Sequence, residues 1–253
     1  MAFRLRMPMR SKKRDADAMT LTDHLAELRR RVIVCVVAFL LAGAVGFILY
    51  PQILDLLRSP YCQISHPCTF YVTGPLDGLS LRIKIAAYGG MFLASPIVLW
   101  EVWRFITPGL KSREKRYAVP FVVASVALFT AGAAVAMFTF SHGLKFLASI
   151  GGPSLKAIYT PNNYLSLILA VIVIFGVTFE FPVLLVSLEL AGVVTPAKLA
   201  SWRRWAIFLI VVVAAVITPS GDPFSMLALA IPMYIFYEVS IIIGRIARRP
   251  ARE

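Results

Sequence analysis

The chain has 253 residues, of which 59% are hydrophobic and only 15% are charged, and its mean hydropathy is +0.78. Soluble domains carry roughly 45–50% apolar and about 25% charged residues, so the composition excludes a soluble enzyme and indicates a membrane protein. The net charge of +13 is compatible with a nucleic-acid partner, an anionic lipid surface or a membrane topology signal. The positions of the charges must decide between them.

Six apolar stretches predict membrane-spanning helices, because a span needs about 20 apolar residues. In chain order they are residues 32–50, 78–103, 117–140, 164–188, 205–218 and 224–244. The fifth has only 14 residues and reaches roughly 21 Å at about 1.5 Å per residue, so we expect a thinned bilayer or a cavity beside it. The pattern predicts an all-α polytopic membrane protein with six transmembrane helices.

The basic residues predict the orientation of these helices. Of the 26 Lys and Arg residues, 21 fall in segments 1–31, 104–116, 189–204 and 245–253, and five fall on the opposite side. The positive-inside rule therefore places both termini in the cytoplasm, in agreement with an even number of spans. The charge is thus mainly a topology signal, and no soluble domain is present to carry a nucleic-acid footprint.

The chain divides into three predicted parts. Residues 1–19 form a basic tail of disordered composition, residues 20–245 form one six-helix transmembrane domain, and residues 246–253 form a cytoplasmic basic tail. The first apolar run is not a secretory signal, because it is long, lacks a clear small-residue cleavage site and precedes five more spans. Met1 and Met19 are both candidate start positions.

The segment before the first span predicts an amphipathic helix along the cytoplasmic interface. Its leucines recur at i, i+4 and i+7: Leu21, Leu25 and Leu28. Glu27 is an acid among arginines. It is either one half of an intrahelical salt bridge to Arg30 or Arg31 or a carboxylate displayed for a cationic partner.

A second isolated acid, Glu114, lies between the second and third spans, among Arg113, Lys115 and Arg116. It either balances the local charge or holds a guanidinium, which a carboxylate can bind through two hydrogen bonds. Pro96 is expected to kink the second span near its inner end.

Glu180 lies inside the fourth apolar stretch. An ionisable residue within the membrane is a functional candidate by default, and the alternative is a neutral, hydrogen-bonded structural glutamate. Helical spacing puts it on a small and partly polar face that should line a cavity or a helix contact; that face comprises Ser166, Leu169, Val173, Gly176 and Ser187. Pro182 is expected to bend the helix just after Glu180.

The remaining polar features lie in loops. Asp222, in a tight turn before the sixth span, is a candidate helix cap. Cys62 and Cys68 share the first external loop, where they form a disulfide or remain two free thiols. The three histidines have no nucleophile or metal-ligand spacing nearby and there is no phosphate-binding glycine loop, so we expect no catalytic residues, metal or cofactor.

Five segments, in this order, resemble the TatC family, the polytopic core subunit of the twin-arginine protein translocase. They are residues 24–29 (HLAELR), 103–110 (WRFITPGL) with Glu114 following, 175–182 (FGVTFEFP), 218–222 (TPSGD) and 230–238 (AIPMYIFYE). The sequence departs from the family pattern at Lys115, where the family often has the first of two paired arginines, and at Met226, where a glutamine is common.

The resemblance implies a concave, glove-like fold with short fifth and sixth helices, in a bacterial cytoplasmic membrane. It implies a receptor, not an enzyme, for folded export substrates that bear an Arg-Arg signal peptide. The proton-motive force would drive the transport of these substrates. Glu27 and Glu114 would bind the arginine pair, with Arg29, Glu101 and Phe105 beside them.

The same resemblance links Glu180 and Pro182 to partner helices of the TatA and TatB type, and it assigns external-loop roles to Pro60 and Asp222. It also implies contact with membrane lipids and with further copies of the chain. Two alternatives remain: a proton-coupled small-molecule carrier that uses Glu180, and a structural scaffold for other membrane helices.

Overall fold

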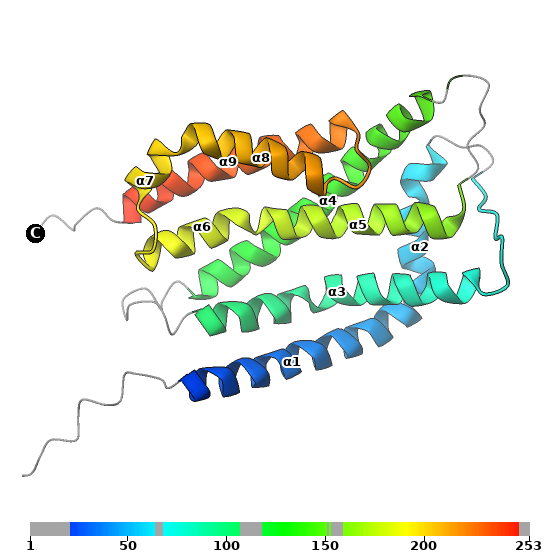
Figure 1. The fold of residues 1–253 in the computed structure, drawn as a ribbon. Coiled ribbons are helices and arrows are strands. Elements are labelled where there is room, and N and C mark those ends of the chain that lie inside the picture. Colours follow the sequence, from blue (N-terminus) through cyan, green and yellow to red (C-terminus); the bar gives the residue numbers. More distant parts are fainter. Residues whose placement is uncertain (1–20, 64–67, 107–117, 151, 153–158, 248–253) are drawn as a thin grey trace, which may run out of the picture.

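The computed structural model describes residues 21–63, 68–106, 118–150, 152 and 159–247. These residues form nine helices and no strand (Figure 1). The helices are α1 (Leu21–Ile48), α2 (Tyr50–Cys62), α3 (Asp77–Ile106), α4 (Ala118–Ile150), α5 (Pro161–Phe179), α6 (Phe181–Leu190), α7 (Pro196–Ser201), α8 (Arg203–Ile217) and α9 (Pro223–Ala247). The expected tail 1–19 lies outside the described residues, and residues 246 and 247 belong to α9 instead of a tail.

Within this described part of the chain, five stretches are long and apolar enough to cross a membrane: Leu25–Ile48, Asp77–Phe105, Val119–Ile150, Pro161–Leu190 and Pro223–Ile246. Helix α8 has 15 residues, or about 22 Å, and is shorter than the ~30 Å hydrocarbon core, as expected for the fifth apolar stretch. The count of six spans stays a prediction.

Helix α9 differs from its expected length. It has 25 residues and spans about 37 Å at 1.5 Å per residue, so the expectation of a short sixth helix is wrong. The helix continues through Pro232 and reaches Ala247, three residues beyond the apolar stretch. The length of the apolar stretch therefore underestimates the length of α9, because the last turn of the helix contains the charged residue Arg245.

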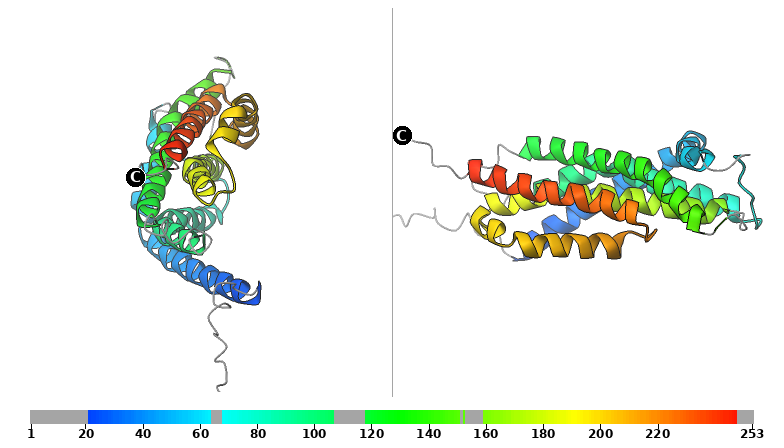
Figure 2. Two further views of the ribbon diagram at one scale, coloured as in Figure 1. Left: turned by 90° about the vertical axis from the view of Figure 1, so that its left-hand side faces the viewer. Right: turned by 90° about the horizontal axis from the view of Figure 1, so that it is seen from above.

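The helices form a curved arrangement. Seen end-on, α1, α3, α4 and α9 follow an arc, and α5, α6 and α8 lie on its inner side (Figure 2). The start of α1, the end of α3, the start of α4 and the end of α9 lie at one end of the bundle, called here the Arg31 end (Figure 1). Helix α2 and the starts of α3 and α5 lie toward the opposite end, called the Cys62 end.

Three helices begin with the same local device, a capping side chain followed by proline. The capping side chain accepts a hydrogen bond from a backbone N–H of the first turn. The position after the cap tolerates proline, because a backbone N–H at that position would have no partner within the helix. The pairs are Thr160–Pro161 for α5, Thr195–Pro196 for α7 and Asp222–Pro223 for α9.

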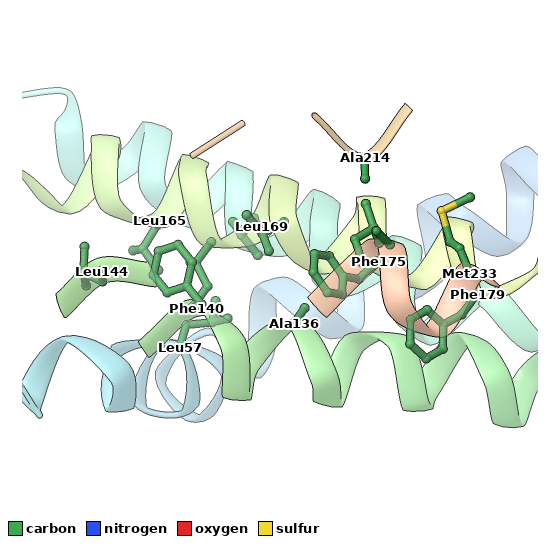
Figure 3. Packing of buried hydrophobic residues seen from close by; sticks show 14 of the residues in the cluster. Leu57, Ala136, Phe140, Leu144, Leu165, Leu169, Phe175, Phe179, Ala214 and Met233 are labelled. Atoms are coloured by element: carbon green, nitrogen blue, oxygen red, sulfur yellow. The ribbon is translucent and has the colours of Figure 1, made fainter. Parts of the chain in front are cut away.

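Glycines allow neighbouring helices to approach closely. A Cβ added at Gly90 of α3 would lie 2.6 Å from the Cα of Gly43 in α1, and one at Gly132 of α4 would lie 2.7 Å from the carbonyl oxygen of Phe175 in α5. Small residues serve this purpose in membrane helix packing. The core fills the space between α4 and α5 with apolar side chains, among them Phe140, Leu165 and Phe175 (Figure 3).

Candidate functional site

Three charged side chains meet at the Arg31 end of the bundle. Helix α1 supplies Glu27 and Arg31, one helical turn apart, and the last turns of α3 supply Glu101. The Arg31 guanidinium donates from Nε to Oε1 of Glu27 at 3.1 Å and from Nη1 to Oε2 of Glu101 at 3.1 Å, and its Nη2 also contacts Glu27. We call these three residues the Arg31 cluster.

The cluster is sequestered by the packing of α1 on α3. The side chains of Arg31 and Glu101 are each 13% exposed, and that of Glu27 is 23% exposed. Exposed ion pairs contribute little because water screens them, and sequestered, doubly hydrogen-bonded pairs hold more firmly. The guanidinium therefore fastens α1 to α3 at the edge of the apolar region.

The structure places Glu27 in a salt bridge with Arg31, which is one of the two pairs expected from helical spacing. It also brings Glu27 close to Glu101, an acid that the family resemblance places at the same site. The central position of Arg31 between them was not expected. The i, i+4 spacing signals its contact with Glu27, but nothing local signals Glu101, which is 70 positions away.

The other residues expected beside this site are less fully placed. Arg29 is exposed on α1, and Phe105 is half-buried near the end of α3. Glu114 lies outside the described residues, so its pairing with Glu27 stays a prediction.

Glu180 lies at a break between two helices. Helix α5 ends at Phe179 and α6 begins at Phe181, with Pro182 in its first turn. The Glu180 carbonyl still accepts from the amides of Val183 and Leu184 at 3.1 Å, so the chain continues in nearly the same direction (Figure 1). The break lies at Glu180, two residues before Pro182, because proline has no backbone N–H with which to continue the hydrogen bonds of α5.

The helix face expected around Glu180 packs on α4. A Cβ added at Gly176 would lie 2.7 Å from the ring of Phe129, and Leu169 is buried. The Glu180 carboxylate lies beside Ser125 of α4, whose hydroxyl oxygen accepts from the indole Nε1 of Trp103 in α3 at 2.9 Å. A polar chain thus runs from the end of α3 through α4 to Glu180.

Asp222 lies at the start of α9, and Pro60 lies within α2. Asp222 is 1% exposed, accepts from the amide of Ser225 at 2.7 Å, and so caps α9. Its carboxylate also packs on Gly143 of α4, where an added Cβ would come within 2.9 Å. Pro60 is buried inside α2, a helix that occupies part of the expected external loop.

Cys62, the last residue of α2, is joined to Cys68 by a disulfide. Just before it, the ring of Tyr61 stacks on Phe70 with centroids 4.7 Å apart. These contacts hold Cys68 and Phe70 against the end of α2. Cys35 is a free, half-buried thiol in α1.

Two further charged residues, neither of them expected at a site, make contacts between helices. Lys84 of α3 donates to Asn162 at 2.5 Å and to Ser166 at 2.9 Å on α5. Glu189 is fully buried in α6, and its carboxylate packs against Gly244 of α9. Both are charged residues in or beside apolar stretches, which is the signal that could have identified them.

A model of the family described as "Sec-independent protein translocase protein (TatC)" matches residues 23–232. The chain belongs to the TatC family. The TatC of Frankia casuarinae is 46% identical over 248 residues, covering 91% of this chain and 68% of its own length, and that of Aquifex aeolicus is 39% identical over 241 residues, covering 93% and 98%.

The fold agrees with solved TatC structures. A crystal structure titled "Twin Arginine Translocase Receptor- TatC" matches with a TM-score of 0.74 at 38% identity, covering 89% of this chain and 100% of that chain. This member of the TatC family is therefore a helical membrane component of the twin-arginine, Sec-independent protein translocase, and a subunit that works with other Tat components.

Proposed function

We propose that this protein recognises the Arg-Arg signal peptides of folded export substrates, and that the Arg31 end of the bundle is the cytoplasmic end where they bind. The observation that carries the proposal is the Arg31 cluster. There, a carboxylate of the family motif, Glu27, holds a guanidinium at the edge of the apolar region. The same carboxylate is suited to a guanidinium from a signal peptide, because carboxylates accept the planar arginine fork through paired hydrogen bonds.

The second arginine of the signal would bind Glu114. This residue belongs to the segment between Ile106 and Ala118, where α3 ends and α4 begins, and both helix ends lie at the Arg31 end (Figure 1). Arg29 and Phe105 are close in sequence to the two helix ends that build the site. They would contact the flanks of the signal peptide.

Glu180 and Pro182 would serve a separate step, assembly with single-span partners of the TatA and TatB type. A half-buried carboxylate at a helix break inside an apolar stretch supports this role. Transport would draw on the proton-motive force, with both termini in the cytoplasm of a bacterial cell, further copies of the chain in the complex, and lipids around it. The alternative of a small-molecule carrier loses its basis, because the chain belongs to a protein translocase family.

The test is photo-crosslinking of an Arg-Arg signal peptide to the full chain in membrane vesicles. Glu27→Ala and Glu114→Ala should each abolish the crosslink while the protein still inserts. Asp55→Ala is the matched control, since Asp55 is a 63% exposed acid on α2 toward the other end. The proposal fails if the Glu27→Ala/Glu114→Ala variant binds Arg-Arg and Lys-Lys peptides as the wild type does.

A further inference from the structure

Among the described residues, the Arg31 cluster differs from the other arginine–carboxylate pairs in its burial and in its number of partners. Arg58 pairs with Asp55 alone and its side chain is 48% exposed, and Arg203 pairs with Glu238 alone and is 46% exposed. Arg31 is 13% exposed and contacts carboxylates from two helices. It is therefore the most sequestered guanidinium of the three.

The acid to which the proposed function assigns an incoming arginine thus already holds an arginine of the chain itself. Nε and Nη2 of Arg31 both face Oε1 of Glu27. An incoming guanidinium that binds through two parallel hydrogen bonds needs both carboxylate oxygens, and Oε1 is the oxygen that Arg31 already occupies. Binding of the signal peptide and the Arg31–Glu27 contact therefore compete.

Glu101 makes this competition reversible. Nη1 of Arg31 lies 3.1 Å from Oε2 of Glu101 and 3.5 Å from the Glu101 carbonyl oxygen, so Arg31 would retain these partners on leaving Glu27. A sequestered charge that loses all its partners is strongly unfavourable, and Glu101 prevents that outcome. The exchange then replaces one guanidinium by another on Glu27 without leaving either charge unpaired.

We propose that Arg31 is an internal competitor for the signal peptide: in the empty protein it occupies Glu27, and on binding it transfers wholly to Glu101. Arg31 thereby sets the affinity threshold that an incoming signal must exceed. This inference rests on the proposed function, since it concerns the same carboxylate. It predicts opposite effects for substitutions at the two ends of one salt bridge.

The experiment measures the affinity of synthetic Arg-Arg signal peptide for the full chain in membrane vesicles. Arg31→Lys keeps the charge but holds Glu27 less firmly, because a lysine lacks the fork. We expect the affinity to rise about tenfold, the scale of one hydrogen bond to a charged group. Arg58→Lys, the matched control, should leave the affinity unchanged.

Glu101→Gln should have the opposite effect on the affinity for the signal peptide. Without the second carboxylate, the displaced Arg31 has no ion-pair partner on α3, so we expect the affinity to fall about tenfold. A purely structural salt bridge would instead weaken peptide binding in both variants, and that result, or unchanged affinity in both, overturns the inference. If Arg31→Lys does not insert, the Glu101→Gln arm still decides, because unchanged or increased affinity there contradicts the transfer.

The two proposals can fail separately. Wild-type binding by Glu27→Ala would remove the proposed receptor site itself. Loss of binding by Glu27→Ala together with unaltered affinity in Arg31→Lys and Glu101→Gln would retain the receptor site and remove only the competitor role of Arg31.

Discussion

The indole nitrogen of Trp103 lies 2.9 Å from the hydroxyl oxygen of Ser125, and this contact joins the end of α3 to α4 beside Glu180. Trp103 is 3% exposed and stacks on Phe121 of α4 with ring centroids 4.8 Å apart, and Ser125 is fully buried. Two residues before Trp103, Glu101 holds Arg31 of α1. The last turns of α3 therefore contact both the proposed signal-peptide site and the partner of the intramembrane carboxylate.

Ser125→Ala should destabilise the protein. It removes the acceptor of the Trp103 N–H and a partner of Glu180, and a buried polar group left unpaired costs about 1–3 kcal/mol. Thermal unfolding in detergent measures the change. Thr130→Ala is the control on the same helix, since the Thr130 hydroxyl is exposed and donates only to Val126 of its own helix; a loss there equal to that of Ser125→Ala would contradict the explanation.

Glu180→Gln should leave signal-peptide crosslinking intact and reduce partner assembly and export. The amide oxygen of glutamine can still accept from Ser125, so the fold is retained while the titratable charge is lost. Co-purification of TatA- and TatB-type subunits and an export assay measure the two effects. Normal assembly and export would make Glu180 a structural residue, and Asp55→Asn, an exposed acid on α2, should be neutral in both assays.

Gly90→Ala should separate α1 from α3. Its Cβ would lie 2.6 Å from the Gly43 backbone, which cannot yield by a side-chain rotation, and overpacking of this kind typically costs about 1–3 kcal/mol. The unfolding temperature in detergent should fall. Gly78→Ala on the same helix meets no atom within 4 Å, so it should not destabilise; equal losses in both variants would show that the close approach is not the cause.

Asp222→Ala should destabilise the start of α9. Loss of a capping side chain costs about 0.5–2 kcal/mol, and Asp222→Asn should recover most of it because its side-chain oxygen can still accept from Ser225. Hydrogen exchange of the first turn of α9 measures the cap directly. If Asp222→Asn has wild-type exchange but impaired export, Asp222 has a role beyond capping.

Much of the fold follows from local sequence. The apolar stretches predict the helices, and the cap–proline pairs such as Asp222–Pro223 mark where they begin, because both signals depend on neighbouring residues. Local signals were less accurate at helix ends and breaks. Helix α9 extends beyond its apolar run to Ala247, and the break at Glu180 precedes Pro182.

The candidate site is only partly a local feature. Glu27, Glu101 and Glu180 are recognisable from sequence as acids in basic or apolar surroundings, and Glu27 lies in a segment that resembles the TatC family. Their partners are not recognisable in this way. Arg31 is one of three consecutive arginines, and Ser125 is a single serine in an apolar helix.

By itself, the sequence determined that this protein belongs to a membrane, that it is helical and that it carries the motifs of the TatC family, because composition and spacing act along the chain. Only the tertiary structure decided that Arg31 lies between Glu27 and Glu101, and that Trp103 reaches Glu180 through Ser125. Such pairings depend on the rotation and separation of packed helices. Those are determined by close contacts between distant residues, such as Gly43 and Gly90.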